Sequence, residues 1–315
     1  MSTPLEAKAQ SVAAQLRNFA RQNRLDYNSV LTRYMNECFL ARLACSPHAD
    51  NLILKGGMSL LVVSLPHTRP TKDIDFLGRG VGNTPEQCQA IISQIAPIEL
   101  NDGVSFDTSQ ISHEVITEEE QYPGVRIKLV GYLGPKTHLP LQIDIGFGDI
   151  TVPAYPPPIS FPQILELHDE ICVRVYSLET SIAEKFEAIV SLGQINSRMK
   201  DIYDIWMLCA YQTFAGEVLS EAILKTFERR HTSLPESVLA FDPQYLADGT
   251  KQEQWAAFLN KNRLKTTAPE EIAIVLSEIA TFLSPVTRAL TEKKPWLYRW
   301  DCEIHQWIPK ANPLT

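Results

Sequence analysis

Two aspartates separated by one residue, Asp73 and Asp75, are the strongest chemical signal in this chain. They stand in the segment TKDIDFL (71–77), whose alternation of polar and apolar residues predicts a half-buried strand. Residues i and i+2 of a strand point to the same face, so the two carboxylates would project side by side. Carboxylates at this spacing repel each other unless a cation lies between them, and Mg²⁺ uses one or two carboxylates together with the phosphate oxygens of a substrate. Exposed strands also carry aspartate pairs without a metal, so the pair alone leaves both interpretations open.

A pair of glycines upstream of the aspartates adds a second signal. Gly56 and Gly57 follow a short β-like run, 51–54, and precede Met58 and Ser59 at the start of a helical pattern. Backbone N–H groups of paired glycines that enter a helix can approach an anion, and Ser59 adds a hydroxyl donor. By itself such a pair is more often a turn. A phosphate-binding turn followed by a metal-binding strand, in this order, indicates a triphosphate site.

The two segments together resemble the nucleotidyltransferase signature of the DNA polymerase β superfamily, LKGGMSLL (54–61) followed by RPTKDIDFL (69–77). Two later segments are similar to the AbiEii-type family, which includes the MenT toxins of bacterial toxin–antitoxin pairs. They are YSLETSIAEKFEAIVSLG (176–193) and NSRMKDIYDIW (196–206), the second of which resembles the family motif R-x-K-D-x-x-D. The likeness runs from about Tyr27 to Met207.

The resemblance implies a role for each matching residue of the first half of the chain. The glycine segment, with Gly56, Gly57 and Ser59, would bind the phosphates of an NTP. Asp73 and Asp75 would bind catalytic Mg²⁺, with two ions expected. Asp144, in LQIDIGFGD (141–149), takes the place of the superfamily's third carboxylate. An aspartate at a strand end is the alternative interpretation, whereas a third ligand near the attacking hydroxyl suits a two-metal mechanism.

The same resemblance assigns residues on two later helical segments. Lys185 has the spacing of a surface lysine paired with its glutamate neighbours, but it matches the family lysine that reaches the triphosphate. Asp201 and Asp204 share a helix face, which is either an exposed acidic surface or, for Asp201, the motif aspartate near that lysine. Arg198 and Lys200 would help to hold phosphate or RNA.

The element pattern predicts an α/β (α+β) fold, with a polymerase β-type core that has a small mixed sheet and a helical C-terminal domain after it. The proline-dense segment 153–162 marks the boundary, giving a nucleotidyltransferase domain over 1–160, N-terminal helices included, and a mainly helical domain over 161–315. We expect the second domain to contribute Lys185 and Asp201 across a cleft. Periodicity predicts helices over 9–46 (with capping residues at Tyr27, Asn28 and Ser29), 84–95, 178–192 and 199–211, and strands over 51–54, 73–77, 124–132 and 139–145.

Composition bounds the remaining possibilities. The formal charge of −8 argues against coating nucleic acid by charge alone, but it leaves a local RNA-binding rim open. The six cysteines have no metal-site or disulfide-scaffold spacing and are expected to be reduced. No apolar run suggests a membrane span and no N-terminal segment resembles a signal peptide, so we expect a cytoplasmic protein without membrane contact.

The resulting hypothesis is a Mg²⁺-dependent nucleotidyltransferase that moves a nucleoside monophosphate from an NTP to a hydroxyl. The resemblance implies an RNA acceptor, in particular the tRNA 3′ end, and a toxin opposed by a separate antitoxin protein. Modification of a protein or a small molecule, or a non-catalytic nucleotide-binding partner, are the alternatives.

Overall fold

The computed structural model describes residues 4–63, 65, 68–116, 124–247 and 249–310. Contacts divide the chain into two compact units. The first comprises residues 1–64, 70–149 and 156–176, and the second comprises 65–69, 150–155 and 177–315. The proline-dense segment 153–162 is therefore shared between the two units.

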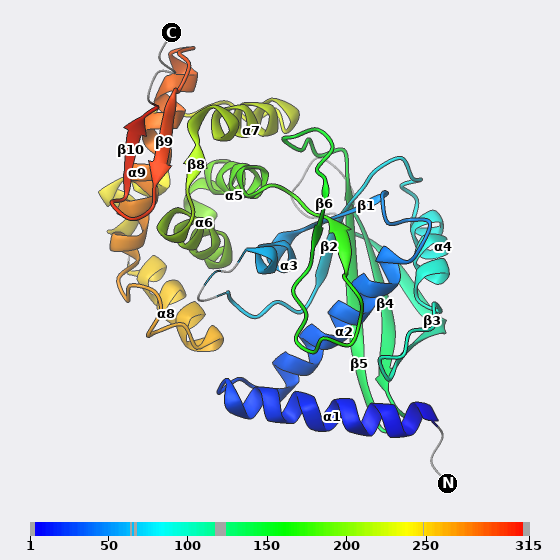
Figure 1. The fold of residues 1–315 in the computed structure, drawn as a ribbon. Helices are drawn as coiled ribbons and strands as arrows, with labels where there is room; N and C mark the ends of the chain where they lie inside the picture. The colour runs from blue at the N-terminus through cyan, green and yellow to red at the C-terminus, as the bar shows by residue number, and fades with distance from the viewer. Residues whose placement is uncertain (1–3, 64, 66–67, 117–123, 248, 311–315) are drawn as a thin grey trace. The chain divides into compact units, whose positions relative to one another are not determined.

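A five-stranded mixed sheet forms the centre of the first unit, with the strand order β1-β2-β5-β4-β3 (Figure 1). Strands β2 and β5 are parallel, and the other neighbours are antiparallel. This confirms the predicted small mixed sheet. A separate antiparallel pair, β6–β7, belongs to the same unit. The strands are β1 (Leu52–Lys55), β2 (Ile74–Gly78), β3 (Val104–Ile116), β4 (Gly124–Leu133), β5 (Thr137–Phe147), β6 (Pro158–Ser160) and β7 (Cys172–Arg174).

Three helices pack on one face of this sheet and share a hydrophobic core with it. Figure 1 shows α4 beside β3, the edge strand. The core takes alternate residues of the strands, such as Ile74 and Phe76 of β2 and Ile143 of β5. The opposite face therefore receives the residues between them, Asp73 and Asp75 among these. The helices are α1 (Pro4–Gln22), α2 (Tyr27–Ala44) and α4 (Pro85–Ile95), and a short turn of helix, α3 (Gly56–Ser59), continues into η1 (Leu60–Val62).

Helix starts follow their capping residues. Thr84 caps α4 as predicted, with Pro85 in the first turn and a reciprocal bond with Gln87. The expected capping residues of α2 were wrong by a few positions. Asp26 is the N-cap, and its carboxylate accepts the backbone N–H of Ser29.

The second unit is mainly helical, as predicted. A small antiparallel sheet, β10-β9-β8, was not foreseen, and it packs Trp300 against Phe282 of α9. The helices are α5 (Leu178–Leu192), η2 (Gly193–Ile195), α6 (Met199–Tyr211), α7 (Gly216–Arg229), η3 (Leu239–Phe241), η4 (Pro243–Leu246), α8 (Thr250–Asn262) and α9 (Ile272–Thr291), and the strands are β8 (Phe214–Ala215), β9 (Tyr298–Asp301) and β10 (Gln306–Pro309).

Among the described helices, α9 alone is long and apolar enough to cross a membrane. No apolar run of that length was predicted from the sequence. An 18-residue stretch of its 20 residues has a mean hydropathy of 1.4, and 50% of that stretch is buried within the protein. Glu278 of α9 accepts a hydrogen bond from the indole of Trp206, at 2.8 Å. A core helix has these features, so length and hydropathy are weak evidence for a span.

All six cysteines are free thiols, as predicted. Cys38, Cys88 and Cys209 are buried, whereas Cys45 and Cys172 are exposed.

Candidate functional site

A row of charged residues crosses the face of the sheet opposite α1, α2 and α4, with one residue from each strand. Strand register places Glu114 opposite Arg126, Arg126 opposite Asp144, Asp144 opposite Asp75, and Asp75 opposite Lys55. Since residues paired in register lie on the same face of a sheet, these side chains are neighbours although they span 89 positions of sequence, from 55 to 144. The structure thus brings two of the predicted carboxylates, Asp75 and Asp144, directly together.

Asp73 directly precedes β2 and lies two residues before Asp75, on the same half-buried side. Its negative charge reaches Arg126, whose pKa it helps to raise. Asp73, Asp75 and Asp144 therefore belong to one acidic region, called the acid face below. Carboxylate oxygens gathered in this way are hard ligands that suit a divalent cation such as Mg²⁺, and their mutual repulsion favours one.

Position 56 requires a glycine because of its backbone conformation and its contact with Asp75. Its φ is +66°, in the left-handed region that favours glycine, and a Cβ built on it would lie 2.0 Å from Oδ2 of Asp75. Any side chain at position 56 would displace this carboxylate. The glycine turn and the aspartate strand, which the sequence paired only by their order, are thus in direct contact.

The other members of the glycine segment are buried. Gly57 belongs to the four-residue helix α3, and Ser59 is 1% exposed. The Ser59 hydroxyl donates to the carbonyl of Gly56 at 2.7 Å, which stabilises the turn that faces Asp75. Binding of phosphate by Gly57 and Ser59 stays a prediction.

Asp144 is held by an arginine that the sequence analysis did not single out. Arg126 donates from Nε to Oδ1 at 2.8 Å and from Nη2 to Oδ2 at 2.7 Å, a bidentate pair. Gln142 adds a bond to Oδ2 at 3.2 Å. The hydrogen bond with Asp144 raises the pKa of Arg126 above its ordinary value, so the guanidinium is a fixed positive charge. Asp144 therefore belongs to a charge network that joins β4 and β5, and its role as a metal ligand stays a prediction.

Lys55 closes the other end of the charged row. Its ammonium lies 2.7 Å from Oδ2 of Asp149 and 5.5 Å from the centre of the Tyr176 ring. Asp149 follows β5, and its ion pair with Lys55 holds this lysine beside Asp75. The acid face is thus flanked by a cation on each side.

A second group of predicted residues gathers within the second unit. Lys185 of α5 lies 2.9 Å from Asp201 and 2.8 Å from Asp204, both on α6. Arg198 pairs with Asp201 at 3.0 Å, and Arg69 makes a bidentate pair with Asp204 at 2.9 Å for both bonds. The five side chains alternate in charge, and we call them the Lys185 cluster.

Burial decides between the two interpretations of Lys185. Its side chain is 11% exposed and its partners are the two aspartates of α6, so the surface lysine paired with its glutamate neighbours is wrong. Asp201 and Asp204 are buried too, so the exposed acidic face is also wrong. Burial by itself lowers the pKa of Lys185, but the carboxylates of Asp201 and Asp204 outweigh it and raise the pKa. Lys200 is exposed at the start of the same helix.

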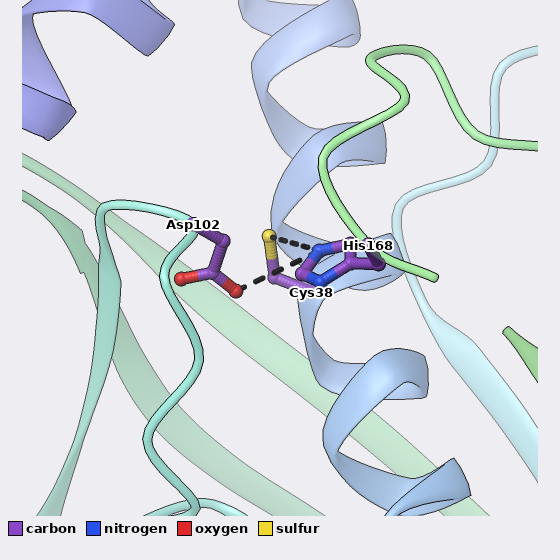
Figure 2. Close-up of side chains that lie close together, drawn as sticks. All are labelled: Cys38, Asp102 and His168. Carbon is purple, nitrogen blue, oxygen red and sulfur yellow. Dashed lines mark hydrogen bonds and ion pairs between the residues drawn. The ribbon is translucent and has the colours of Figure 1, made fainter. Parts of the chain in front are cut away.

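A third polar group lies in the core of the first unit, where Cys38, Asp102 and His168 approach one another (Figure 2). Nε2 of His168 is 3.9 Å from the Cys38 sulfur and 3.7 Å from Oδ2 of Asp102. A nucleophilic triad uses both ring nitrogens, one toward the nucleophile and one toward the acid, so contacts from a single nitrogen do not make one. Burial raises the pKa of the Cys38 thiol well above its ordinary value, which removes the thiolate that such chemistry requires.

The carboxylate of this third group is already neutralised. Arg42 donates to both oxygens of Asp102, at 2.6 and 3.2 Å, and Val104 donates its backbone N–H to Oδ1. A divalent cation here would also lack a thiolate ligand, because burial keeps Cys38 protonated. The group is a buried network that holds α2 to the loop before β3.

The positioning residues Arg126, Lys55 and Arg69 were missed because each depends on a distant partner. A weak signal exists for Arg69, which stands four residues before Asp73 in RPTKDIDFL. For Arg126, only the pairing of β4 with β5 reveals that Asp144 is its neighbour.

Comparison with known proteins agrees with this geometry. Among solved structures, MenT4, a nucleotidyltransferase toxin from Mycobacterium tuberculosis H37Rv, matches with a TM-score of 0.51 and 14% sequence identity, over 90% of this chain and 98% of that one. At this identity the likeness shows the fold. No curated protein matches the sequence.

The fold, a mixed sheet with a mainly helical C-terminal part, and the family match over residues 38–278 together define the class of protein, a nucleotidyltransferase. The particular family follows from the sequence, which matches the nucleotidyl transferase AbiEii toxins of type IV toxin–antitoxin systems over residues 38–278. Because the match covers more than half of the chain, the chain belongs to this family. NTP as substrate, a divalent metal and an antitoxin partner are general to proteins of this kind.

Proposed function

We propose that this chain transfers a nucleoside monophosphate from an NTP to a hydroxyl of RNA, in particular at the tRNA 3′ end, with release of pyrophosphate. The observation that carries the proposal is the pairing of Asp75 with Asp144 on one sheet face. Gly56 lies beside this pair, and a Cβ on it would collide with Asp75. A surface kept free of side chains next to gathered carboxylates suits a metal-bound phosphate.

Mg²⁺ fits the acid face because its preferred ligands are oxygens, and Asp73, Asp75 and Asp144 would hold it, as two ions. When bound, Mg²⁺ would lower the pKa of the acceptor hydroxyl and neutralise charge on the triphosphate. The protein's own part is to hold these carboxylates in place through Gly56, Arg126 and the strand register.

In this proposal the Lys185 cluster serves the phosphates of the nucleotide or of the RNA. Arg198 is 31% exposed and Lys200 is exposed, so both can contact a phosphate. Lys185 and Asp201 are buried in ion pairs, and Asp201 holds the guanidinium of Arg198 through Nε. Direct contact of Lys185 with the triphosphate is part of the proposal, and it requires this lysine to exchange one aspartate for a phosphate oxygen.

The RNA acceptor and the antitoxin partner enter from the family, and we place their action in the cytoplasm. Net charge supports no large electropositive surface, so an RNA contact would be local. Experiment separates the RNA acceptor from the alternatives, which are a protein acceptor, a small-molecule acceptor and a non-catalytic nucleotide-binding role.

The test is incubation of the purified chain with each labelled NTP, Mg²⁺, tRNA and total cell protein, followed by separation of RNA from protein. Label in tRNA that disappears with EDTA and in the Asp73→Ala variant is the expected result. Label in protein alone would contradict the RNA acceptor. NTP binding without label in any acceptor would support the non-catalytic role and overturn the enzyme mechanism.

The toxin role has its own test in cells. Expression should arrest growth, and the Asp73→Ala variant, expressed at the same level, should not. Equal arrest by both chains would show that the toxicity does not come from nucleotide transfer.

A further inference from the structure

Asp144 has most of its hydrogen-bonding capacity occupied by the protein. A carboxylate accepts about four hydrogen bonds, two on each oxygen. Within the described part of the chain, Arg126 and Gln142 both donate to Oδ2, and Arg126 also donates to Oδ1. The remaining capacity lies on Oδ1, so Asp144 can offer one oxygen to a cation while it keeps Arg126.

Arg126 also contacts an acidic residue on the side away from Asp144. Its Nη1 lies 3.7 Å from Glu114, and Glu114 accepts a bond from Lys128 at 2.8 Å. An alternating series, Lys128, Glu114, Arg126 and Asp144, therefore runs across β3, β4 and β5. A planar guanidinium that contacts both oxygens of a carboxylate also sets the plane of that carboxylate, which an ammonium cannot do.

We propose that Arg126 is a positioning residue of the metal site, which orients Asp144 so that it binds the divalent cation through Oδ1 alone. The inference rests on the proposed function, because it assigns a supporting residue to the same acid face. Hydrogen-bond partners of metal-binding carboxylates typically contribute about 10- to 100-fold to metal affinity or activity.

Arg126 could affect metal affinity in two opposite directions, so the sign of the change on its removal tests the inference. A positive charge near a cation repels it, so removal of Arg126 would tighten metal binding if its charge were its main contribution. Loss of the oriented carboxylate would weaken metal binding. Arg126→Gln removes the charge and the bidentate contact, whereas Arg126→Lys keeps the charge and removes only the bidentate contact.

The experiment is titration of the full chain with Mn²⁺, without nucleotide, with free Mn²⁺ measured by electron paramagnetic resonance. We expect Arg126→Gln and Arg126→Lys each to weaken Mn²⁺ binding by about tenfold or more. Lys136→Gln is the matched control, because it removes an exposed cation from the turn between the same two strands, β4 and β5. We expect it to change the affinity by less than about twofold, as exposed charges contribute little.

Tighter binding by Arg126→Gln, or unchanged binding by Arg126→Lys, would overturn the positioning role. An equal loss in Lys136→Gln would reduce the effect to bulk charge and overturn it as well. If Arg126→Gln fails to fold, as judged by circular dichroism, Arg126→Lys decides alone, because it preserves the ion pairs with Asp144 and Glu114. Absence of Mn²⁺ binding by the wild-type chain would instead contradict the proposed function.

Discussion

Asp75 of β2 lies directly opposite Asp144 of β5, in the parallel pairing of the five-stranded sheet. Residues paired on neighbouring strands are about 4.8 Å apart, so two negative charges face each other at close range. Any residue larger than glycine at position 56 would collide with the Asp75 carboxylate. The sheet therefore holds carboxylates of two strands side by side, where both could supply oxygen ligands to a divalent cation.

Stabilisation by Mg²⁺ should depend on this pair. The wild-type chain should gain about 2.7 kcal/mol of unfolding free energy at a Mg²⁺ concentration 100-fold above the dissociation constant. Asp75→Asn should lose this gain, and its transfer rate should fall by about a thousandfold, which corresponds to about 4 kcal/mol. Thermal unfolding with EDTA and with Mg²⁺ measures the first effect. Asp107→Asn, on the edge strand β3 of the same sheet, should keep the gain.

Gly56→Ala should disturb Asp75 beyond the cost of its backbone conformation. Gly80 is the matched control because it has the same φ of +66°, whereas its nearest atom, Nδ2 of Asn51, would lie 3.6 Å from an added Cβ. Both variants should lose about 1–2 kcal/mol of stability from the left-handed backbone. Only Gly56→Ala should also lose transfer activity and Mg²⁺ binding. Equal activity in the two variants would mean that the close contact with Asp75 has no functional weight.

Stability should fall as pH rises because of Glu37, which lies buried in α2. Burial raises its pKa from 4.5 to about 7, despite the ion pair with Arg33 and the bond from the N–H of Ile164. Between these values the folded chain holds a proton that the unfolded chain has lost, so the free energy of unfolding decreases with rising pH, by up to ~3 kcal/mol. Urea unfolding across this range measures the slope.

Glu37→Gln should flatten this dependence, since an amide does not titrate. Glu221→Gln, at a 50% exposed site, should leave the slope as it is in the wild type. A slope that is unchanged in Glu37→Gln would assign the pH dependence to another group.

Loss of Lys185 should destabilise the second unit. Lys185→Met leaves Asp201 and Asp204 in a buried site with one cation fewer, and removal of one partner of a buried pair costs about 3–5 kcal/mol. Lys225→Met, which breaks an exposed pair with Glu221, should cost about 0.5 kcal/mol or less. Chemical denaturation of both variants gives the comparison.

A second substitution separates structure from chemistry at this position. Asp201→Asn in the Lys185→Met background removes one of the two buried carboxylates that lose a cation, and it should restore part of the stability. Full stability of Lys185→Met with loss of transfer would instead show that Lys185 acts on the substrate and not on the fold.

Much of the first unit was predictable because its signals are local. Alternation over 73–77 places Ile74 and Phe76 in the core and Asp75 on the opposite face, as found. The capping of α4 was equally readable from Thr84 and Pro85. By contrast, β3 was missed, because most of its 13 residues are exposed at a sheet edge and show no apolar alternation.

The sequence by itself determined that Asp73 and Asp75 share a face, since two acids one residue apart on a strand must do so, and the predicted metal site rests on this. It also determined the order of the glycine turn and that strand, and hence the family. Only the tertiary structure decided that Asp144 stands opposite Asp75, that Arg126 holds Asp144, and that Lys185 is buried between Asp201 and Asp204. These contacts join residues that are 16 to 69 positions apart, so strand register and helix packing determine them and local periodicity does not.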